Sequence, residues 1–215
     1  MVDPPGTDLL SARLRRGTRA AHDAARRNGF LDGLVTGRLP LAAYAEMTAH
    51  HWFIYESLES ASSAMADDPV AGRFIFPALF RVPILESDLR FLYGPRWQSR
   101  ISALPATTTY CTRLRSAAFD DATGFVAHHY TRYLGDLSGG QFLKRAVVEA
   151  YRFRRSGYRF FVFDGVDPAL FKARYRERLD TVPWRRAEQD AFLAEVSVAY
   201  RLNTDVLNEL AERWS

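Results

Sequence analysis

The residues most suggestive of chemistry are one carboxylic acid and three glycines in the same apolar run. Apolar side chains recur there at intervals of three and four, which predicts a long helix. Gly135, Gly139 and Gly140 interrupt the pattern, although each glycine costs about 1 kcal/mol relative to alanine in a helix interior. Gly135 and Gly139 are four residues apart and share a helix face, and Asp136 lies beside that face. The spacing therefore predicts bare backbone next to a single acid.

A strip of backbone without side chains can serve two purposes. It lets a flat ligand approach the helix closely, and the neighbouring carboxylate can then orient water or move a proton. It also allows a second helix to pack closely, and the glycine spacing alone is equally compatible with that role. The acid between the glycines, with Arg132 one turn earlier, favours the ligand.

Histidines are the next candidates for chemistry, and one of them is distinctive. His22 has four neighbours on the same side at helical spacings, namely Arg15, Thr18, Arg19 and Arg26. Cationic neighbours keep a histidine neutral, as metal ligation requires. The sequence contains no H-E-x-x-H and no paired C-x-x-C, so His22 lacks the companions of a free-metal site. It suits an axial ligand to a macrocycle that supplies four nitrogens.

The apolar periodicity predicts the helices that must position these residues. Proline, glycine and Asp-Asp-Pro signals bound most of them. The predicted ranges are 8–27, 40–66, 83–93, 106–118, 123–154, 168–181 and 184–213. Residues 70–82 read as irregular or short-helical, residues 156–166 as an aromatic loop, and no alternating strand pattern is present. We predict one all-α domain over residues 1–215, with residues 1–7 flexible.

Composition excludes several classes of protein. The 215 residues are 47% hydrophobic, which is ample for a core. The 29 basic and 25 acidic residues are interspersed, and a net charge of +4 is too diffuse to indicate nucleic-acid binding. The single cysteine, Cys111, excludes an internal disulfide and suits a reducing compartment. With no secretory signal and no apolar run of about 20 residues, we expect a cytoplasmic protein without a membrane span.

Residues 133–141 read Y-L-G-D-L-S-G-G-Q and closely resemble the distal-helix signature of the heme oxygenases. The resemblance extends over roughly residues 9–213. L-R-R-G-T-R-A-A-H-D at 14–23 is similar to the proximal segment of the family, and F-K-A-R-Y-R-E-R at 171–178 to its propionate-binding helix. It implies an all-α bundle in which heme lies between a proximal helix and a glycine-bent distal helix.

The resemblance also implies roles for individual residues. His22 becomes the axial iron ligand, and the implied heme contacts are His22, Arg15, Tyr130, Gly135, Ser138, Gly139, Lys172 and Arg176. A distal network that orders water is implied for Tyr55, Tyr110, Arg132, Asp136 and Asn203. One position departs from the family. Arg26 stands one turn after His22, where the family usually carries a glutamate that makes the ligand more basic, so we expect a neutral, weakly donating histidine.

The implied activity is oxidative cleavage of heme b (iron protoporphyrin IX) to biliverdin, with release of ferrous iron and carbon monoxide. Heme would be both substrate and cofactor, and the other partners would be dioxygen and an electron donor such as a ferredoxin or a flavoprotein reductase. Such an enzyme serves iron acquisition or pigment supply. Two alternatives stay open at this point: a non-catalytic heme carrier or sensor, and an enzyme of the thiaminase kind, which would use Cys111.

Overall fold

The computed structural model describes residues 9–20 and 28–215. The chain forms α-helices throughout these ranges, and no strand occurs in them, which confirms the all-α prediction. The α-helices are α1 (Leu10–Gly17), α3 (Gly29–Val35), α4 (Leu41–Ala64), α5 (Val82–Tyr93), α6 (Pro105–Ala117), α7 (Ala122–His129), α8 (Gly140–Ala150), α9 (Pro168–Asp180) and α10 (Arg186–Arg213). Short 3₁₀ helices are η1 (Ala71–Phe74), η2 (Pro77–Leu79), η3 (Trp97–Arg100) and η5 (Arg159–Phe161), and η4 (Tyr130–Leu134) is a π-helix.

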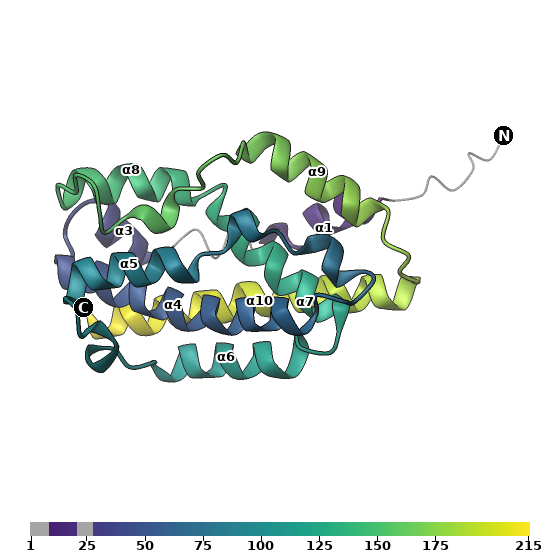
Figure 1. The fold of residues 1–215 in the computed structure, drawn as a ribbon, viewed down its shortest axis with the longest axis horizontal. Helices are drawn as coiled ribbons and strands as arrows, with labels where there is room; N and C mark the ends of the chain where they lie inside the picture. Colours follow the sequence, from purple (N-terminus) through teal and green to yellow (C-terminus); the bar gives the residue numbers. More distant parts are fainter. Residues whose placement is uncertain (1–8, 21–27) are drawn as a thin grey trace.

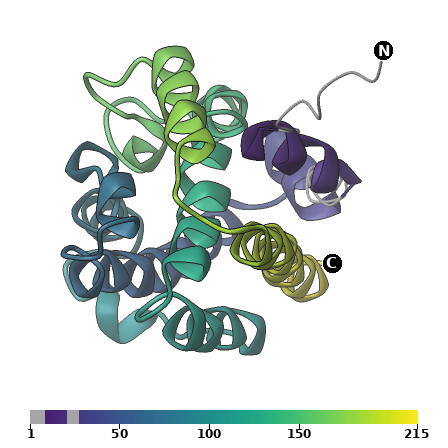
Figure 2. The ribbon, with the colours of Figure 1, turned by 90° about the vertical axis from the view of Figure 1, so that its right-hand side faces the viewer.

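The helices form a bundle with α7 in its middle. Helix α7 packs against α10, α6 and α4, and α5 packs on the other side of α4. Figure 1 and Figure 2 both place α8 and α9 at one edge of the bundle and α6 at the opposite edge. Helix α3 contacts α8 and α10, whereas α1 contacts α9 and α10. The glycine-rich segment between α7 and α8 therefore lies among α3, α4, α9 and α10.

Helix starts follow local capping chemistry. The carboxylate of Asp121 accepts hydrogen bonds from the backbone N–H groups of Thr123 and Gly124 at the start of α7. Asp167 does the same for α9, which also has Pro168 at its first position. At the end of α5, Gly94 adopts φ +87°, a left-handed conformation that side chains rarely tolerate. These signals explain why most helix ends fell close to their predicted positions.

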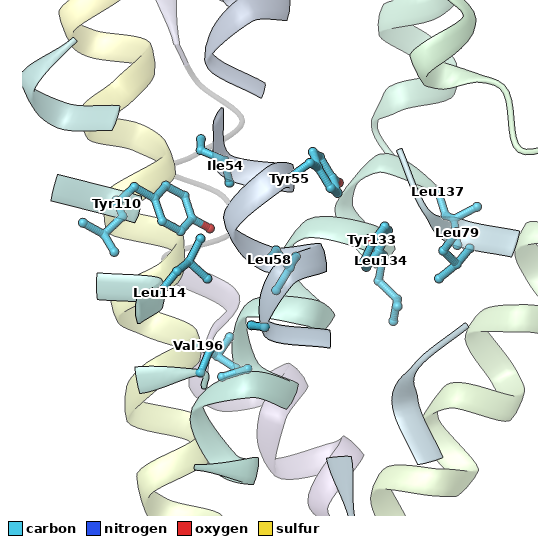
Figure 3. Close-up of a cluster of buried hydrophobic side chains, with 14 of the residues drawn as sticks. Ile54, Tyr55, Leu58, Leu79, Tyr110, Leu114, Tyr133, Leu134, Leu137 and Val196 are labelled. Atoms are coloured by element: carbon cyan, nitrogen blue, oxygen red, sulfur yellow. The ribbon is translucent and has the colours of Figure 1, made fainter. Parts of the chain in front are cut away.

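One large hydrophobic core holds the bundle together, and a small second cluster forms around Ala49, Leu89 and Trp97. Figure 3 shows part of the large core, with Tyr110 to the left of α4 in this view and Tyr133 to the right. Tyr55, Tyr110 and Tyr133 are completely buried within it, together with Leu58 and Leu114. Burying a large apolar side chain contributes about 1.5–3 kcal/mol, so this core fixes the three phenol groups firmly in place.

One prediction near the N-terminus was wrong. The helix predicted over 8–27 is interrupted, because α1 ends at Gly17 and Thr18 forms a turn. Asn28, predicted to stop that helix, is itself non-helical and caps α3, a helix that was not predicted: its side chain accepts a hydrogen bond from the backbone N–H of Phe30 at 3.0 Å. Asparagine fits both roles, and a seven-residue helix gives too few apolar repeats to be recognised.

The helix predicted over 123–154, with a bend at its glycines, is indeed interrupted there. It divides into α7, the π-helix η4, a turn at residues 137–139, and α8, which ends at Ala150. Gly135 and Gly139 keep ordinary helical torsions, with φ of −61° and −74°. Gly135 and Gly139 are therefore not required by the backbone conformation. What distinguishes them from other residues at these positions is that they have no side chain.

No helix in the described ranges is long and apolar enough to cross a membrane.

Candidate active site

A cavity of about 540 Å³ opens beside the glycine-rich segment. Its walls come from α3, α4, the η4–α8 segment, α9 and α10, which are distant in sequence. Of the residues implied by the resemblance, it brings together Tyr130, Arg132, Gly135, Asp136, Ser138, Gly139, Lys172, Arg176 and Asn203. A cavity of this size is in the range of small-molecule and cofactor sites.

The three glycines separate into two kinds. A Cβ atom built on Gly135 would meet no described atom within 4 Å, and one on Gly139 would come no closer than 3.6 Å to the carbonyl oxygen of Gly135. A Cβ on Gly140 would lie 3.2 Å from Cδ1 of Phe161. Gly140 thus fits the packing role, whereas Gly135 and Gly139 present bare backbone to open space. Both line the cavity.

Asp136 is the acid beside that bare backbone. Its Oδ2 accepts a hydrogen bond from the Tyr55 hydroxyl, and the residue lines the cavity. Burial raises the pKa of Asp136 above its usual value, while the charge of Arg132 and the bond from Tyr55 offset part of that rise. A carboxyl group with a raised pKa that faces a cavity is suited to exchanging a proton.

Arg132 is 4% exposed and is only partly paired. Nη1 donates to Oδ1 of Asn203 at 2.6 Å, and the guanidinium lies 5.0 Å from the ring centre of Tyr55. Nε and Nη2 of Arg132 and the hydroxyl of Tyr110 are buried and have no hydrogen-bond partner among the described residues. Unpaired buried polar groups are costly, so ordered water is expected between them. Burial raises the pKa of Tyr110 to about 12, which keeps it a phenol.

Cationic side chains line the cavity on α9. Nζ of Lys172 donates to the Ser138 hydroxyl at 3.2 Å, and Arg176 lies one turn further along the same helix. Tyr130 also lines the cavity, and burial raises the pKa of its phenol. Two cations a turn apart can bind two carboxylates of one ligand.

Some predicted site residues lie elsewhere. Tyr55 and Tyr110 are buried behind the cavity wall and do not line it. Arg15 is exposed on α1 and is not among the residues that line the cavity, so its contact with a ligand stays a prediction. His22 and Arg26 lie outside the described residues.

Sequence reasoning missed several residues of the cavity wall. Helix α3 contributes Leu31, Asp32 and Val35, and α4 contributes Met47 and His51. The α3 residues gave no usable signal because the helix itself was not recognised. His51 did give a signal in the sequence, because it is a polar residue on the otherwise apolar inner stripe of α4.

The remaining described histidines and the cysteine are engaged by the fold. His50 pairs with Thr107 at 2.9 Å, His128 with Glu195 at 2.9 Å, and His129 with Tyr175 at 3.1 Å. Within the described part of the chain, no cluster of three or more His, Cys, Asp or Glu side chains could hold a metal ion. Cys111 contacts the carbonyl oxygen of Phe53 at 3.4 Å, and burial raises the pKa of its thiol. It does not line the cavity, which removes the support for a cysteine-based enzyme.

Comparisons with known proteins agree with this geometry. A sequence model of the heme oxygenase family matches residues 8–209. Heme oxygenase 1 of the cyanobacterium Synechocystis is 33% identical, over 94% of this chain and 84% of its own length. Heme oxygenase 1 of Gallus gallus is 37% identical, over 94% of this chain and 69% of its own length. The crystal structure of the Synechocystis protein in complex with heme superposes with a TM-score of 0.90, covering 95% of this chain and 93% of that chain. The chain belongs to the heme oxygenase family.

Proposed function

We propose that this protein is a heme oxygenase that opens heme to biliverdin and releases ferrous iron and carbon monoxide. The observation that carries the proposal is the bare backbone of Gly135 and Gly139 beside Asp136 in one cavity. Relatives named heme oxygenase, similar over most of the chain, support an enzyme and not a non-catalytic heme carrier.

The described wall of the cavity fits a flat macrocycle with acidic substituents. Gly135 and Gly139 offer a surface on which no Cβ intervenes. Lys172 and Arg176 supply positive charge for the two propionates of heme. Bound heme supplies both the ring that is opened and the iron that activates dioxygen. His22 is the proposed axial ligand, and this assignment rests on the sequence alone.

Asp136 is the proposed catalytic acid–base group. Tyr55 holds its Oδ2 through a hydrogen bond, and Arg132 stabilises its charged form. The raised pKa favours the protonated carboxyl more than in an exposed aspartate, and water at the cavity surface can carry its proton onward. Asn203 anchors Arg132, so the guanidinium keeps its position while water exchanges around it. Tyr110 adds a phenol that donates to this water.

The reaction also requires dioxygen and external electrons, and a ferredoxin or a flavoprotein reductase is the proposed donor. Exposed arginines on α8 and α9, Arg145 and Arg174, offer positive charge near the cavity to an acidic partner. Electrostatic docking weakens with salt, because the Debye length falls from about 10 Å at 0.1 M to about 3 Å at 1 M. Electron transfer that is insensitive to salt would contradict this part of the proposal.

The test uses purified protein with one equivalent of hemin. A Soret band reports binding, and an electron donor is then added in air, with catalase and an iron chelator present. Decay of the band with formation of biliverdin and carbon monoxide is the expected result. A Soret band that persists with competent donors would identify a carrier or sensor. Absence of any Soret band would contradict the assignment of the cavity to heme.

A further inference from the structure

His51 is a polar residue on an apolar helix stripe. The inner face of α4 carries Met47, His51, Ile54 and Tyr55, and only His51 among them brings a titratable nitrogen base. It lines the cavity together with Met47, and its ring stacks on Phe160 with centroids 4.9 Å apart. A leucine would fill the same space without the cost of desolvating an imidazole. A polar group placed in this way calls for a partner.

The two ring nitrogens of His51 have different surroundings. Nδ1 is buried and makes no hydrogen bond of normal geometry within the described residues, although the ring interacts with the backbone of Met47 one turn earlier. Because His51 lines the cavity, its ring can meet water there. Burial and the charge of Arg132 hold the pKa of His51 well below its usual value, so the ring is neutral and carries one donor and one acceptor.

Arg132 supplies further hydrogen-bond donors close to His51. His51 and Tyr55 are one turn apart on α4, so their Cβ atoms are about 5–6 Å from each other. The Arg132 guanidinium lies 5.0 Å from the Tyr55 ring centre and keeps Nε and Nη2 unpaired among the described groups. A stable internal water needs two to four polar partners, and these donors and His51 provide them around one space.

We propose that His51 is a positioning residue that holds a water in the cavity against Arg132, next to Asp136. This inference rests on the proposed function and extends it to a residue on α4. The imidazole transfers no proton in this role. It fixes the water through which Asp136 exchanges protons with the cavity.

A purely structural role for His51 makes a different prediction. If the ring only stacks on Phe160, an apolar side chain of similar size should replace it without consequence. A hydrogen-bonding role requires a polar atom at the ring position. His51→Leu and His51→Gln separate the two, because leucine fills the space and glutamine also restores a donor and an acceptor.

The matched control is His50→Leu. His50 is adjacent in sequence, is bonded to Thr107, and does not line the cavity. The same substitution there tests for general damage to α4. Folded His50→Leu protein should react at the wild-type rate.

The experiment combines one readout without heme and two with it. Ring ¹⁵N NMR of the heme-free protein should show a neutral His51 at about pH 5.5. With hemin bound, His51→Leu should keep heme affinity, lower the biliverdin rate about tenfold and shift its pH profile by about one unit. It should also shift the pH titration of the ferric absorption spectrum. His51→Gln should return the rate, the pH profile and this titration most of the way to their wild-type values.

Three results would overturn the proposal: a charged His51 ring at that pH, a His51→Leu variant with the wild-type rate and pH profile, or equal impairment by leucine and glutamine. Failure of the wild-type protein to degrade heme would instead reject the proposed function. The NMR measurement would still report on His51 in that case.

Discussion

Two aspartates of this molecule, one buried and one at the cavity, have opposite surroundings. Asp88, on α5, is 0% exposed, and both of its carboxylate oxygens accept backbone hydrogen bonds, from Gly157 at 2.9 Å and Phe160 at 2.8 Å. Asp136, between η4 and α8, accepts one side-chain bond from Tyr55 and otherwise faces the cavity. Asp88 is thus enclosed by the fold, and Asp136 keeps part of its hydrogen-bonding capacity for something else.

The pKa values do not distinguish these two acids. Burial raises the pKa of both, and hydrogen bonds to Asp88 or the charge of Arg132 beside Asp136 offset part of the rise. What differs is the use of the acceptor oxygens. A perturbed carboxylate whose partners are all backbone amides stabilises a loop, whereas one with spare capacity at a cavity can act on a ligand.

The largest expected effect is the loss of activity in Asp136→Asn. Asparagine keeps the shape but cannot exchange a proton, and general acid–base groups contribute about 10²–10⁴-fold to rate. We expect biliverdin formation to fall at least about 100-fold, with the Soret band of the heme complex retained. Single-turnover assays with hemin measure the rate, and circular dichroism confirms the fold. A wild-type rate would remove Asp136 from the mechanism.

Asp88→Ala should have the opposite profile. It leaves the N–H groups of Gly157 and Phe160 buried without partners, at about 1–3 kcal/mol each. We expect the free energy of unfolding to fall by about 2–6 kcal/mol in urea titrations. Activity per folded molecule should be unchanged. A stable Asp88→Ala protein with impaired turnover would break the contrast between the two acids.

The glycines offer the same contrast at the level of backbone. Gly135→Ala adds a Cβ where no described atom lies within 4 Å, so it should stabilise the heme-free protein by up to about 1 kcal/mol. The same methyl group should weaken heme binding about tenfold, because it fills the space offered to the ring. Hemin titrations and thermal unfolding measure the two effects.

Gly124→Ala is the packed counterpart. Its Cβ would lie 1.7 Å from the carbonyl oxygen of Ala117, so α6 and α7 must separate. Stability should fall in this variant. If Gly135→Ala also lost stability without losing affinity, Gly135 would be a packing residue like Gly124.

The sequence predicted those parts of the fold that depend on local chemistry. Proline at the starts of α5, α6 and α9 and the Asp167 cap are readable without a structure. Helix α3 was not readable because seven residues carry too little periodicity. The π-helix η4 was not readable either, since its one-residue change of register depends on tertiary packing around Tyr130–Leu134.

The candidate site was predictable where its residues lie in one signature. Gly135, Asp136 and Gly139 were recognised together because they are close in sequence. His51 carried a signal as a polar residue on an apolar stripe, but only the structure places it in the cavity with residues of η4 and α9. Which glycine is open and which is packed likewise required the position of Phe161.

The last prediction extends the contrast to histidines and concerns the pH dependence of stability. Burial lowers the pKa of His50 to about 4 and of His129 to about 3, from an ordinary 6.5, and both rings are enclosed by protein. Because the pKa of such a histidine is lower in the folded state, the unfolded chain binds a proton first as pH falls. The contribution of the neutral histidine to the free energy of unfolding is therefore complete above pH 6.5 and is lost as pH falls towards the folded-state pKa. Each enclosed histidine should therefore cost about 1.4 kcal/mol of stability per pH unit across that window.

His129→Phe tests this directly, because phenylalanine keeps the ring beside Tyr175, which stacks on His129 at 5.8 Å. The variant loses the bond to the Tyr175 hydroxyl and should be less stable than wild type at pH 7. Between pH 6.5 and 5, the wild type should lose the contribution of His129 to its free energy of unfolding, and the variant has no such contribution to lose. The difference in free energy of unfolding between the two should therefore shrink by about 1.4 kcal/mol per pH unit. Urea unfolding at several pH values measures it. A constant difference would mean that His129 is hydrated or charged in the folded protein, and enclosure would then no longer separate His129 from the cavity-facing His51.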